Sequence, residues 1–341
     1  MPSRIRRMRG RLVAALMATF LAQAPAAGGT LDGAVLQRQL QALAGGFDGR
    51  VGICAHDASS MACVDGDGRY SMQSVMKLVV GAAAMDAIDQ GRLRLDEPVV
   101  VRREDLSLYV QPIAKLVGPD GYRTTIGDLI ARAVIESDSA ATDILFARVG
   151  GARGIAAFLA RKGIRDLRVD RDERHLQTES VGLTWKPAYV DADVLDRDID
   201  GVPEARRTAA FAAYLKDPRD TSTPKAMVRF LHALATGRLL SPESARHLIA
   251  VMNRTVTFPD RLKAGTPDSW TLGHKTGTSM TWNGVNGATN DVGILTAPDG
   301  HSIVVAVFIS GSRRSSAERA ALMANVARAV TAAYRPDNAK H

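Results

Sequence analysis

Strand-like segments near both ends of the chain, with a long helical region between them, constrain the fold more than any other feature of this sequence. β-rich runs predict strands at residues 51–55, 61–64, 270–275, 291–296 and 302–310. Apolar residues at helical spacing predict helices at residues 31–43, 71–88, 125–134, 139–149, 155–162, 224–235, 242–252 and 316–334, with Thr30 as the N-cap of the first. We therefore predict an α/β (α+β) protein whose α/β layer is built from both ends of the chain, with an all-α domain inserted between them.

The first 27 residues have the pattern of a secretory signal peptide. Five arginines between residues 4 and 11 precede an apolar run from Leu12 to Ala22, and small residues follow up to Ala27. An apolar run of this length is too short for a stable membrane anchor, and no later stretch is longer. We expect a secreted or periplasmic protein that leaves the membrane after cleavage. A disordered basic tail is the alternative.

The basic charge of the chain belongs largely to that segment. The formal net charge of +8 falls to +3 once five arginines and no acidic residue are removed, so we expect no nucleic-acid partner. With 46% hydrophobic and 23% charged residues, the composition is that of a globular protein, which excludes collagen, coiled coils and largely disordered chains. Nothing in the sequence indicates an obligate oligomer, and we expect a monomer.

The two cysteines, Cys54 and Cys63, flank the turn-like sequence at residues 57–60. In a hairpin centred on this turn they would face each other directly, and an oxidising compartment would permit a cross-strand disulfide. Two buried free thiols are the alternative. No third Cys or His has ligand spacing, so we expect no metal site here.

Ser74-Val75-Met76-Lys77 is the first candidate for chemistry. Three residues apart on a helix, the hydroxyl and the ammonium lie on one face. A serine hydroxyl is a weak nucleophile and needs a base within reach, and Lys77 could serve if neighbouring cations and desolvation lower its pKa. The same spacing recurs at Ser222 and Lys225, where Pro224 indicates only a helix start.

Two further motifs follow along the chain. Ser137-Asp138-Ser139 lies between two predicted helices, a place where a hydroxyl is usually a cap. Lys275-Thr276-Gly277-Thr278 ends a predicted strand, and Gly277 would let a ligand approach the backbone closely. Each motif by itself has a plain structural explanation, but their joint occurrence in this order does not.

Taken together, the three motifs resemble those of the penicillin-binding proteins and serine β-lactamases. The segment from Arg171 to Gln177, which contains Glu173, resembles the Ω-loop of class A β-lactamases, and residues 220–224 resemble the exit from that loop. Arg171 and Asp220 would pair across its neck. Residues 289–293 resemble the strand that follows the Lys-Thr-Gly motif in that class. Thr278-Ser279 with a longer 280–288 connection resembles the branch that contains extended-spectrum enzymes.

The resemblance implies the domain organisation. It implies an antiparallel five-stranded sheet flanked by N- and C-terminal helices, formed by residues 28–66 and 254–335. Residues 67–253 would form the all-α domain, and residues 336–341 a flexible tail. No cofactor and no metal are required, and the partner is a small-molecule β-lactam.

The resemblance also implies residue roles. Ser74 would attack the lactam carbonyl, with the N–H groups of Ser74 and Thr278 as the oxyanion hole. Ser137, assisted by Lys77 and Lys275, would pass a proton to the leaving nitrogen. Glu173 with Gln177 would hold the water that hydrolyses the acyl-enzyme.

The substrate would be held from two sides. The resemblance implies that Lys275, Thr276 and Thr278 meet its carboxylate and that Arg261 occupies the place of an anchoring arginine. Tyr109 resembles the aromatic wall of the site.

Three departures from the family pattern stand out. Ser139 takes the place of the usual asparagine and is shorter, with one donor. Gln177 stands where asparagine is commoner, so the water could shift. The Ω-loop is enlarged by an insertion at about residues 178–216, with a short helix expected at 204–216.

Within the insertion, Asp196-x-Asp198-x-Asp200-Gly201 resembles the start of a calcium loop. Its twelfth position, where a bidentate Glu is needed, is Arg207. We therefore favour a solvated acidic loop over a calcium site.

Two alternatives to a β-lactamase stay open. The first is a penicillin-binding or D-alanyl-D-alanine peptidase-like protein that acylates and deacylates slowly, against which Glu173 argues. The second is a non-catalytic binding protein that uses the acidic insertion as an interaction surface.

Overall fold

The computed structural model describes residues 29–336; the predicted signal peptide and all but the first residue of the predicted tail lie outside this range. A central antiparallel sheet has the strand order β3-β2-β11-β10-β8, and the short β9 (Thr281–Trp282) pairs with β10. The five main strands are β2 (Arg50–His56), β3 (Met61–Val64), β8 (Thr271–Thr278), β10 (Val285–Thr296) and β11 (Ser302–Ser312). Because β2 pairs with β11, the two ends of the chain share one sheet, which confirms the predicted fold class.

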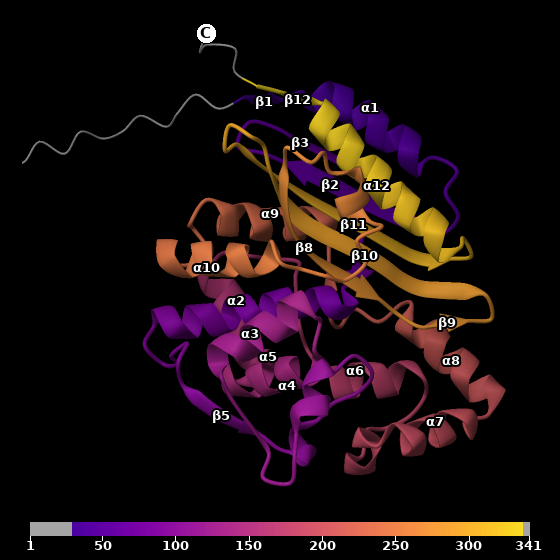
Figure 1. Ribbon diagram of the computed structural model, residues 1–341. Coiled ribbons are helices and arrows are strands. Elements are labelled where there is room, and N and C mark those ends of the chain that lie inside the picture. Colours follow the sequence, from indigo (N-terminus) through magenta and orange to yellow (C-terminus); the bar gives the residue numbers. More distant parts are fainter. Residues whose placement is uncertain (1–28, 337–341) are drawn as a thin grey trace, which may run out of the picture.

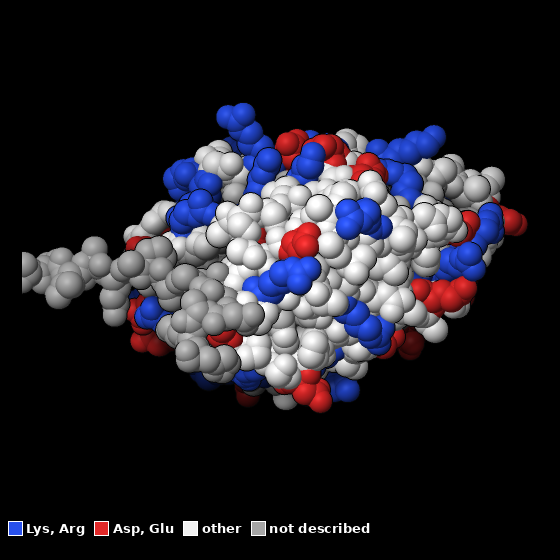
Figure 2. All heavy atoms as spheres, turned by 90° about the horizontal axis from the view of Figure 1, so that it is seen from above, with Lys and Arg blue, Asp and Glu red and all other residues white. Residues whose placement is uncertain are grey.

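Helices α1 (Gly33–Ala44) and α12 (Ser316–Ala332) cover one face of the sheet (Figure 1). Along β11, Val305 and Val307 point to this face, whereas Val304 and Phe308 point to the opposite core. This period of two is what a strand buried on both faces requires. Figure 2 looks down on the α1–α12 side and shows basic and acidic side chains interspersed there.

The predicted cap of α1 is wrong by two residues. Asp32, not Thr30, is the N-cap, and its carboxylate accepts a hydrogen bond from the Val35 N–H at 3.0 Å. Thr30 instead belongs to β1 (Thr30–Leu31), which pairs with β12 (Tyr334–Arg335). Pairing between the two ends of the chain therefore decides where the helix begins.

The other face of the sheet packs on the helical part of the molecule. Helix α9 (Pro224–Ala235) contacts β2 and β11, and α2 (Met76–Asp89) lies at the centre of the helical part with almost its entire length buried. Around α2 pack α3 (Ile126–Ile135), α4 (Ser139–Arg148), α5 (Gly151–Arg161) and α10 (Pro242–Met252). Smaller elements are β5 (Pro98–Val101), β6 (Tyr122–Thr125) and α11 (Leu262–Gly265). Within residues 29–336 no helix is long and apolar enough to cross a membrane.

The helix predicted at residues 71–88 begins later than expected. Residues Tyr70–Ser71 form β4, which pairs with β7 (Thr221–Ser222), and Gln73–Val75 form a 3-10 turn. The α-helix itself starts at Met76. This pairing with a strand about 150 residues away has no local sequence signal.

The insertion folds into helices. After α6 (Glu173–Ser180) come a 3-10 turn at Pro187–Val190, then α7 (Ala192–Asp200) and α8 (Glu204–Tyr214), so the predicted helix at 204–216 is confirmed and the predicted acidic loop is wrong. Asp191 caps α7, and Leu195 packs with Tyr189 and Leu108 in a small core of its own. The capping Asp191 and Asp193 in the first turn stabilise the start of α7, because the positive end of the helix dipole favours negative charge there. Over residues 29–336 no group of three or more His, Cys, Asp or Glu side chains could hold a metal ion.

Cys54 and Cys63 are directly opposed on β2 and β3 and form a disulfide, so the free-thiol alternative is excluded. The bond closes a short loop with a sequence separation of 9. We expect the C54A/C63A double variant to lose about 2–3 kcal/mol of unfolding free energy through the greater entropy of its unfolded chain. Urea unfolding with and without reductant tests this. The reductant should lower the stability of the wild type and leave the double variant unchanged; equal stability of both proteins without reductant would contradict the expectation.

Candidate active site

Ser74 lies in the 3-10 turn that leads into α2, so its side chain and that of Lys77 share one side. The preceding residue, Gln73, has a φ of +47°, a left-handed backbone conformation that costs energy in a non-glycine residue and is common at functional sites. Asn290 on β10 holds this turn, because its amide donates to the carbonyls of Ser71 and Met72 at 2.9 Å each. Sequence reasoning included Asn290 only as part of the resemblance at residues 289–293, and it did not single out Gln73.

Gly277 allows strand β8 to lie against the nucleophile turn. A Cβ at this position would lie 2.5 Å from the Met72 carbonyl oxygen and 3.2 Å from the Ser74 nitrogen. Any other residue would push β8 away. The glycine thus brings the next residue, Thr278, to the same cavity as Ser74.

Lys77 is fully buried and has three neighbours in the site. Its Nζ donates to the Ser137 carbonyl at 2.6 Å and to the Ser139 hydroxyl at 3.0 Å. It also lies 3.6 Å from Oε1 of Glu173. The substitution of asparagine by Ser139 therefore keeps a polar contact to this lysine.

Lys275 is the second buried lysine of the site. Its Nζ donates to the Ser137 hydroxyl at 2.9 Å and to the Thr276 carbonyl at 3.0 Å. Burial, followed by the charge of nearby Lys77, holds the pKa of Lys275 well below its usual range. Ser137, with a φ of +61°, thus contacts both lysines, Lys77 through its backbone carbonyl and Lys275 through its hydroxyl, and the hydroxyl contact with Lys275 can transfer a proton.

Glu173 is the first residue of α6 and is 2% exposed. Its N–H donates to Oδ1 of Asp143 at 2.7 Å, and Gln177 Nε2 donates to its Oε2 at 3.1 Å. Among the described side chains, its Oε1 accepts no hydrogen bond. A buried carboxylate oxygen with a lysine at 3.6 Å and no donor is suited to accept a proton.

Asp143, which sequence reasoning missed, fixes the start of α6. Besides the Glu173 N–H it accepts a hydrogen bond from the Ser107 hydroxyl at 2.6 Å. Burial, followed by the charges of Asp172 and Glu173, raises the pKa of Asp143 to about 7.

This pKa gives a pH-dependent contribution to stability. Because the folded state binds the proton of Asp143 more tightly than the unfolded state, the stabilisation is present below pH ~4 and is lost as the pH rises towards 7. A change of this size corresponds to about 4 kcal/mol. We expect the D143N variant, which cannot titrate there, to gain stability relative to the wild type between pH 4 and 8 in urea unfolding. A difference between the two proteins that does not vary with pH would contradict this.

Arg171 and Asp220 form the predicted pair across the neck of the loop. Arg171 Nε lies 2.6 Å from Asp220 Oδ2, and both side chains are buried. Asp220 also accepts hydrogen bonds from the N–H groups of Asp170 and Arg171. The other guanidinium nitrogens of Arg171 contact Glu179 at 2.6 Å and Asp217 at 3.2 Å. The loop is therefore tied at its base by one buried arginine.

The site residues surround a cavity of about 250 Å³. It is lined by Ser74, Lys77, Tyr109, Val110, Ser139, Glu173, Gln177, Ser180, Val181, Thr278 and Met280. Tyr109 is 54% exposed and forms part of its rim. The structure thus brings together most of the residues that the sequence singled out.

Four of the predicted catalytic and substrate-binding residues do not line this cavity: Ser137, Lys275, Arg261 and Thr276. Arg261 is buried, with its guanidinium 3.8 Å from the Phe258 ring centroid, and it donates to Thr278 Oγ1 at 2.6 Å. Burial lowers the pKa of Arg261 to about 10, so it stays charged at neutral pH. Arg261 therefore orients the Thr278 hydroxyl, while the Thr276 hydroxyl contacts that of Thr257 at 2.6 Å.

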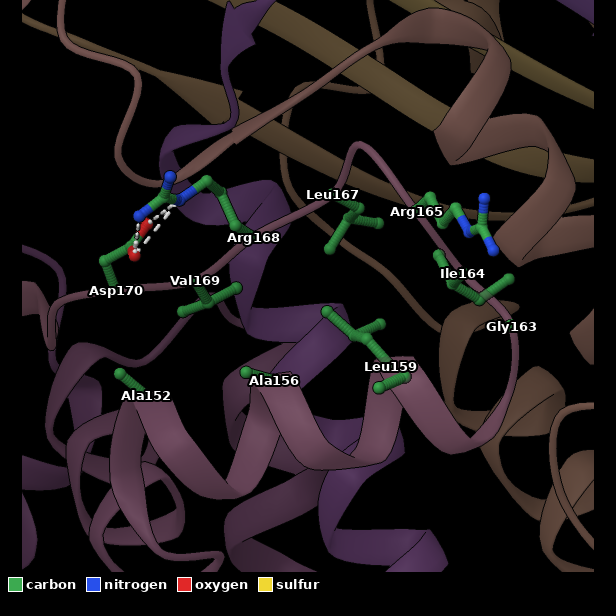
Figure 3. A pocket seen from close by; sticks show the side chains of 11 residues that line it. Ala152, Ala156, Leu159, Gly163, Ile164, Arg165, Leu167, Arg168, Val169 and Asp170 are labelled. Carbon is green, nitrogen blue, oxygen red and sulfur yellow. Dashed lines mark hydrogen bonds and ion pairs between the residues drawn. The ribbon is translucent and has the colours of Figure 1, made fainter.

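A larger cavity of about 530 Å³ lies elsewhere, between α5 and the segment at 163–170 (Figure 3). Apolar side chains such as Leu159 and Ile164 line much of it. Its charged groups Arg168 and Asp170 already pair with each other at 2.5 Å. It contains no nucleophile beside a base, so we assign no chemistry to it.

Comparison with known proteins identifies the family. Residues 35–334 match the Beta-lactamase enzyme family. The chain is 27% identical to β-lactamase VEB-1 of Pseudomonas aeruginosa over 78% of each protein, and 28% identical to the extended-spectrum β-lactamase PER-1 of the same organism over 86% of this chain and 85% of the relative. The solved structure of an ancestral class A β-lactamase superposes with a TM-score of 0.70 at 31% identity, covering 87% of this chain and 99% of that chain. The chain therefore belongs to the class A β-lactamase family.

Proposed function

We propose that this protein is a serine β-lactamase that hydrolyses the β-lactam amide of penicillins and cephalosporins through an acyl-enzyme on Ser74. The observation that carries the proposal is the placement of Glu173, whose buried carboxylate lines the same cavity as Ser74 and faces Lys77. A protein that only binds or acylates has no use for a second buried base at this place. Family membership and the β-lactamase names of the relatives support the proposal.

Acylation follows from the contacts of the two lysines. Lys77, with Glu173 at 3.6 Å, takes the proton of the Ser74 hydroxyl as it attacks the lactam carbonyl. The N–H groups of Ser74 and Thr278 stabilise the developing oxyanion, a contribution of roughly 2.7–4 kcal/mol per donor in other enzymes. As the C–N bond breaks, the Ser137 hydroxyl gives its proton to the leaving nitrogen and recovers one from Lys275.

In the deacylation step, Glu173 activates the hydrolytic water. The Oε1 atom of Glu173 removes a proton from a water, which attacks the acyl carbonyl. As the C–O bond to Ser74 breaks, the Ser74 oxygen takes back the proton held by Lys77, and exchange with solvent removes the proton from Glu173 and returns one to Lys275. The side-chain oxygen of Gln177 is left to accept from this water, because its amide nitrogen donates to Glu173 and to Gln73. The substrate carboxylate is met by the Thr278 hydroxyl, which lines the cavity and is held by Arg261, whereas Thr276 and Lys275 lie outside the cavity lining.

The proposal is tested by following hydrolysis of a chromogenic cephalosporin by the mature protein and by its S74A variant. The wild type should turn over many equivalents and S74A none. One equivalent of colour followed by arrest would favour the penicillin-binding or D-alanyl-D-alanine peptidase-like alternative, which Ser139 and the insertion support. No colour and no covalent label would contradict both.

We further propose that the chain belongs to the branch with extended-spectrum enzymes and that it is exported as a monomer after removal of residues 1–27. Thr278-Ser279 and the longer connection at 280–288 support the first statement, and the signal-like N-terminus supports export. Comparing kcat/KM for benzylpenicillin and for a cephalosporin with a bulky side chain tests the first. N-terminal sequencing and light scattering of the protein recovered from the periplasm test the second.

A further inference from the structure

Tyr214, the last residue of α8, connects the insertion to the nucleophile turn. Its ring is buried against the backbone of β10, since a Cβ at Gly287 would lie 2.7 Å from the ring carbon Cε1 of Tyr214 and 3.1 Å from the Phe211 ring. Trp282 on β9 ties the same helix down, because its indole N–H donates to the Thr208 hydroxyl at 3.1 Å. Figure 1 shows α8 beside this end of the sheet. These contacts fix the position of α8 and therefore the position of Tyr214.

The hydroxyl of Tyr214 makes two hydrogen bonds to the turn that carries Ser74. It donates to the Ser71 hydroxyl at 3.0 Å and accepts from the side-chain amide nitrogen of Gln73 at 2.7 Å. Burial raises the pKa of Tyr214, so the hydroxyl stays protonated and keeps its donor.

These bonds determine which way the Gln73 amide points. With its nitrogen on Tyr214, Gln73 presents its oxygen to Gln177, whose amide nitrogen donates to it at 3.1 Å. The same nitrogen of Gln177 donates to Glu173 Oε2, also at 3.1 Å. Without the tyrosine hydroxyl the Gln73 amide can turn over, and two amide nitrogens would then face each other. Gln177 would have to rotate and lose its contact with Glu173.

We propose that Tyr214 is a positioning residue for deacylation, which acts through Gln73 and Gln177 on Glu173. The insertion then helps to position the deacylation residues and does not only cover the outside of the site. This inference rests on the proposed function. It also explains how the buried Gln73, with its strained backbone next to Ser74, is held in place.

The test is Tyr214→Phe, which removes only the hydroxyl. The matched control is Tyr189→Phe in the same insertion, whose hydroxyl donates to Asp198 at 2.9 Å and makes no contact with the site. We expect the rate of acyl-enzyme loss, followed by intact-mass spectrometry, to fall roughly tenfold or more in Y214F, because small displacements of a base are costly. The acylation rate should change much less, and Y189F should match the wild type in both rates.

A structural role for Tyr214 predicts different results. If Tyr214 acts through Gln177, the effect of Y214F on deacylation should vanish in a Q177A background, whereas an independent structural effect would multiply with it. Unchanged deacylation in Y214F, or equal effects on both rates, or full multiplicativity with Q177A, would overturn the inference while leaving the β-lactamase proposal intact. A wild type that neither turns over substrate nor forms an adduct would overturn the proposed function and this inference with it.

Discussion

Replacing Glu173 with glutamine should trap the protein as a covalent adduct on Ser74. The variant keeps the size of the side chain and its contact with Gln177, but it has no carboxylate to take a proton from water. Removal of a general base costs roughly 10²–10⁴-fold, and we expect the rate of deacylation to fall by that factor. Acylation should fall less, because Lys77 remains beside the nucleophile.

The measurement is the fraction of protein carrying the added mass at intervals after mixing with a penicillin. E204Q is the matched control, because Glu204 is an exposed glutamate in the first turn of α8 outside the site. It should show the wild-type time course. An E173Q variant that clears its adduct as fast as the wild type would show that another group activates the water.

The second large effect is expected at the neck of the Ω-loop. R171A leaves Asp220 buried with its main charge partner removed, and breaking a buried pair in this way costs about 3–5 kcal/mol. The pKa of Asp220 is already raised by burial, and loss of the arginine would favour the protonated form further. Because Glu173 lies two residues beyond Arg171, deacylation should be impaired along with stability.

Urea unfolding measures the loss of stability in R171A, and the adduct time course measures the loss of deacylation. R94A is the control, since Arg94 forms an exposed pair with Asp96 at 3.1 Å, and such pairs contribute less than ~1 kcal/mol. An R171A variant as stable as R94A would contradict the role assigned to the neck. The stability of the D220N variant should lie between those of R171A and R94A. Its side-chain oxygen can still accept hydrogen bonds from the two backbone N–H groups.

The sequence was most informative where local pattern and chemistry agree. β-rich runs located the strands of the sheet, and the opposed cysteines followed from the length of their turn. The motifs and the Ω-loop segment identified Ser74, Lys77 and Glu173, which line one cavity, and Ser137, which hydrogen-bonds to both Lys77 and Lys275.

The sequence was least informative where segments that are far apart in the chain contact each other. Asp143 and Tyr214 support the site through contacts with residues 30 to 143 positions away, and no local pattern marks them. The prediction of a solvated loop at α7 was wrong, because a helix with a buried Leu195 and a capping Asp191 has the same composition as such a loop. The late start of α2 likewise depends on pairing between β4 and β7.

The central claim is that Ser74 is acylated and that a water activated by Glu173 releases it. The most direct test mixes the mature protein with a chromogenic cephalosporin and follows colour and intact mass in parallel. Continued colour over many turnovers, with a small transient adduct that maps to Ser74, is the predicted result. One equivalent of colour with a persistent adduct on Ser74 would contradict the claim, because acylation would then proceed without a working Glu173 water.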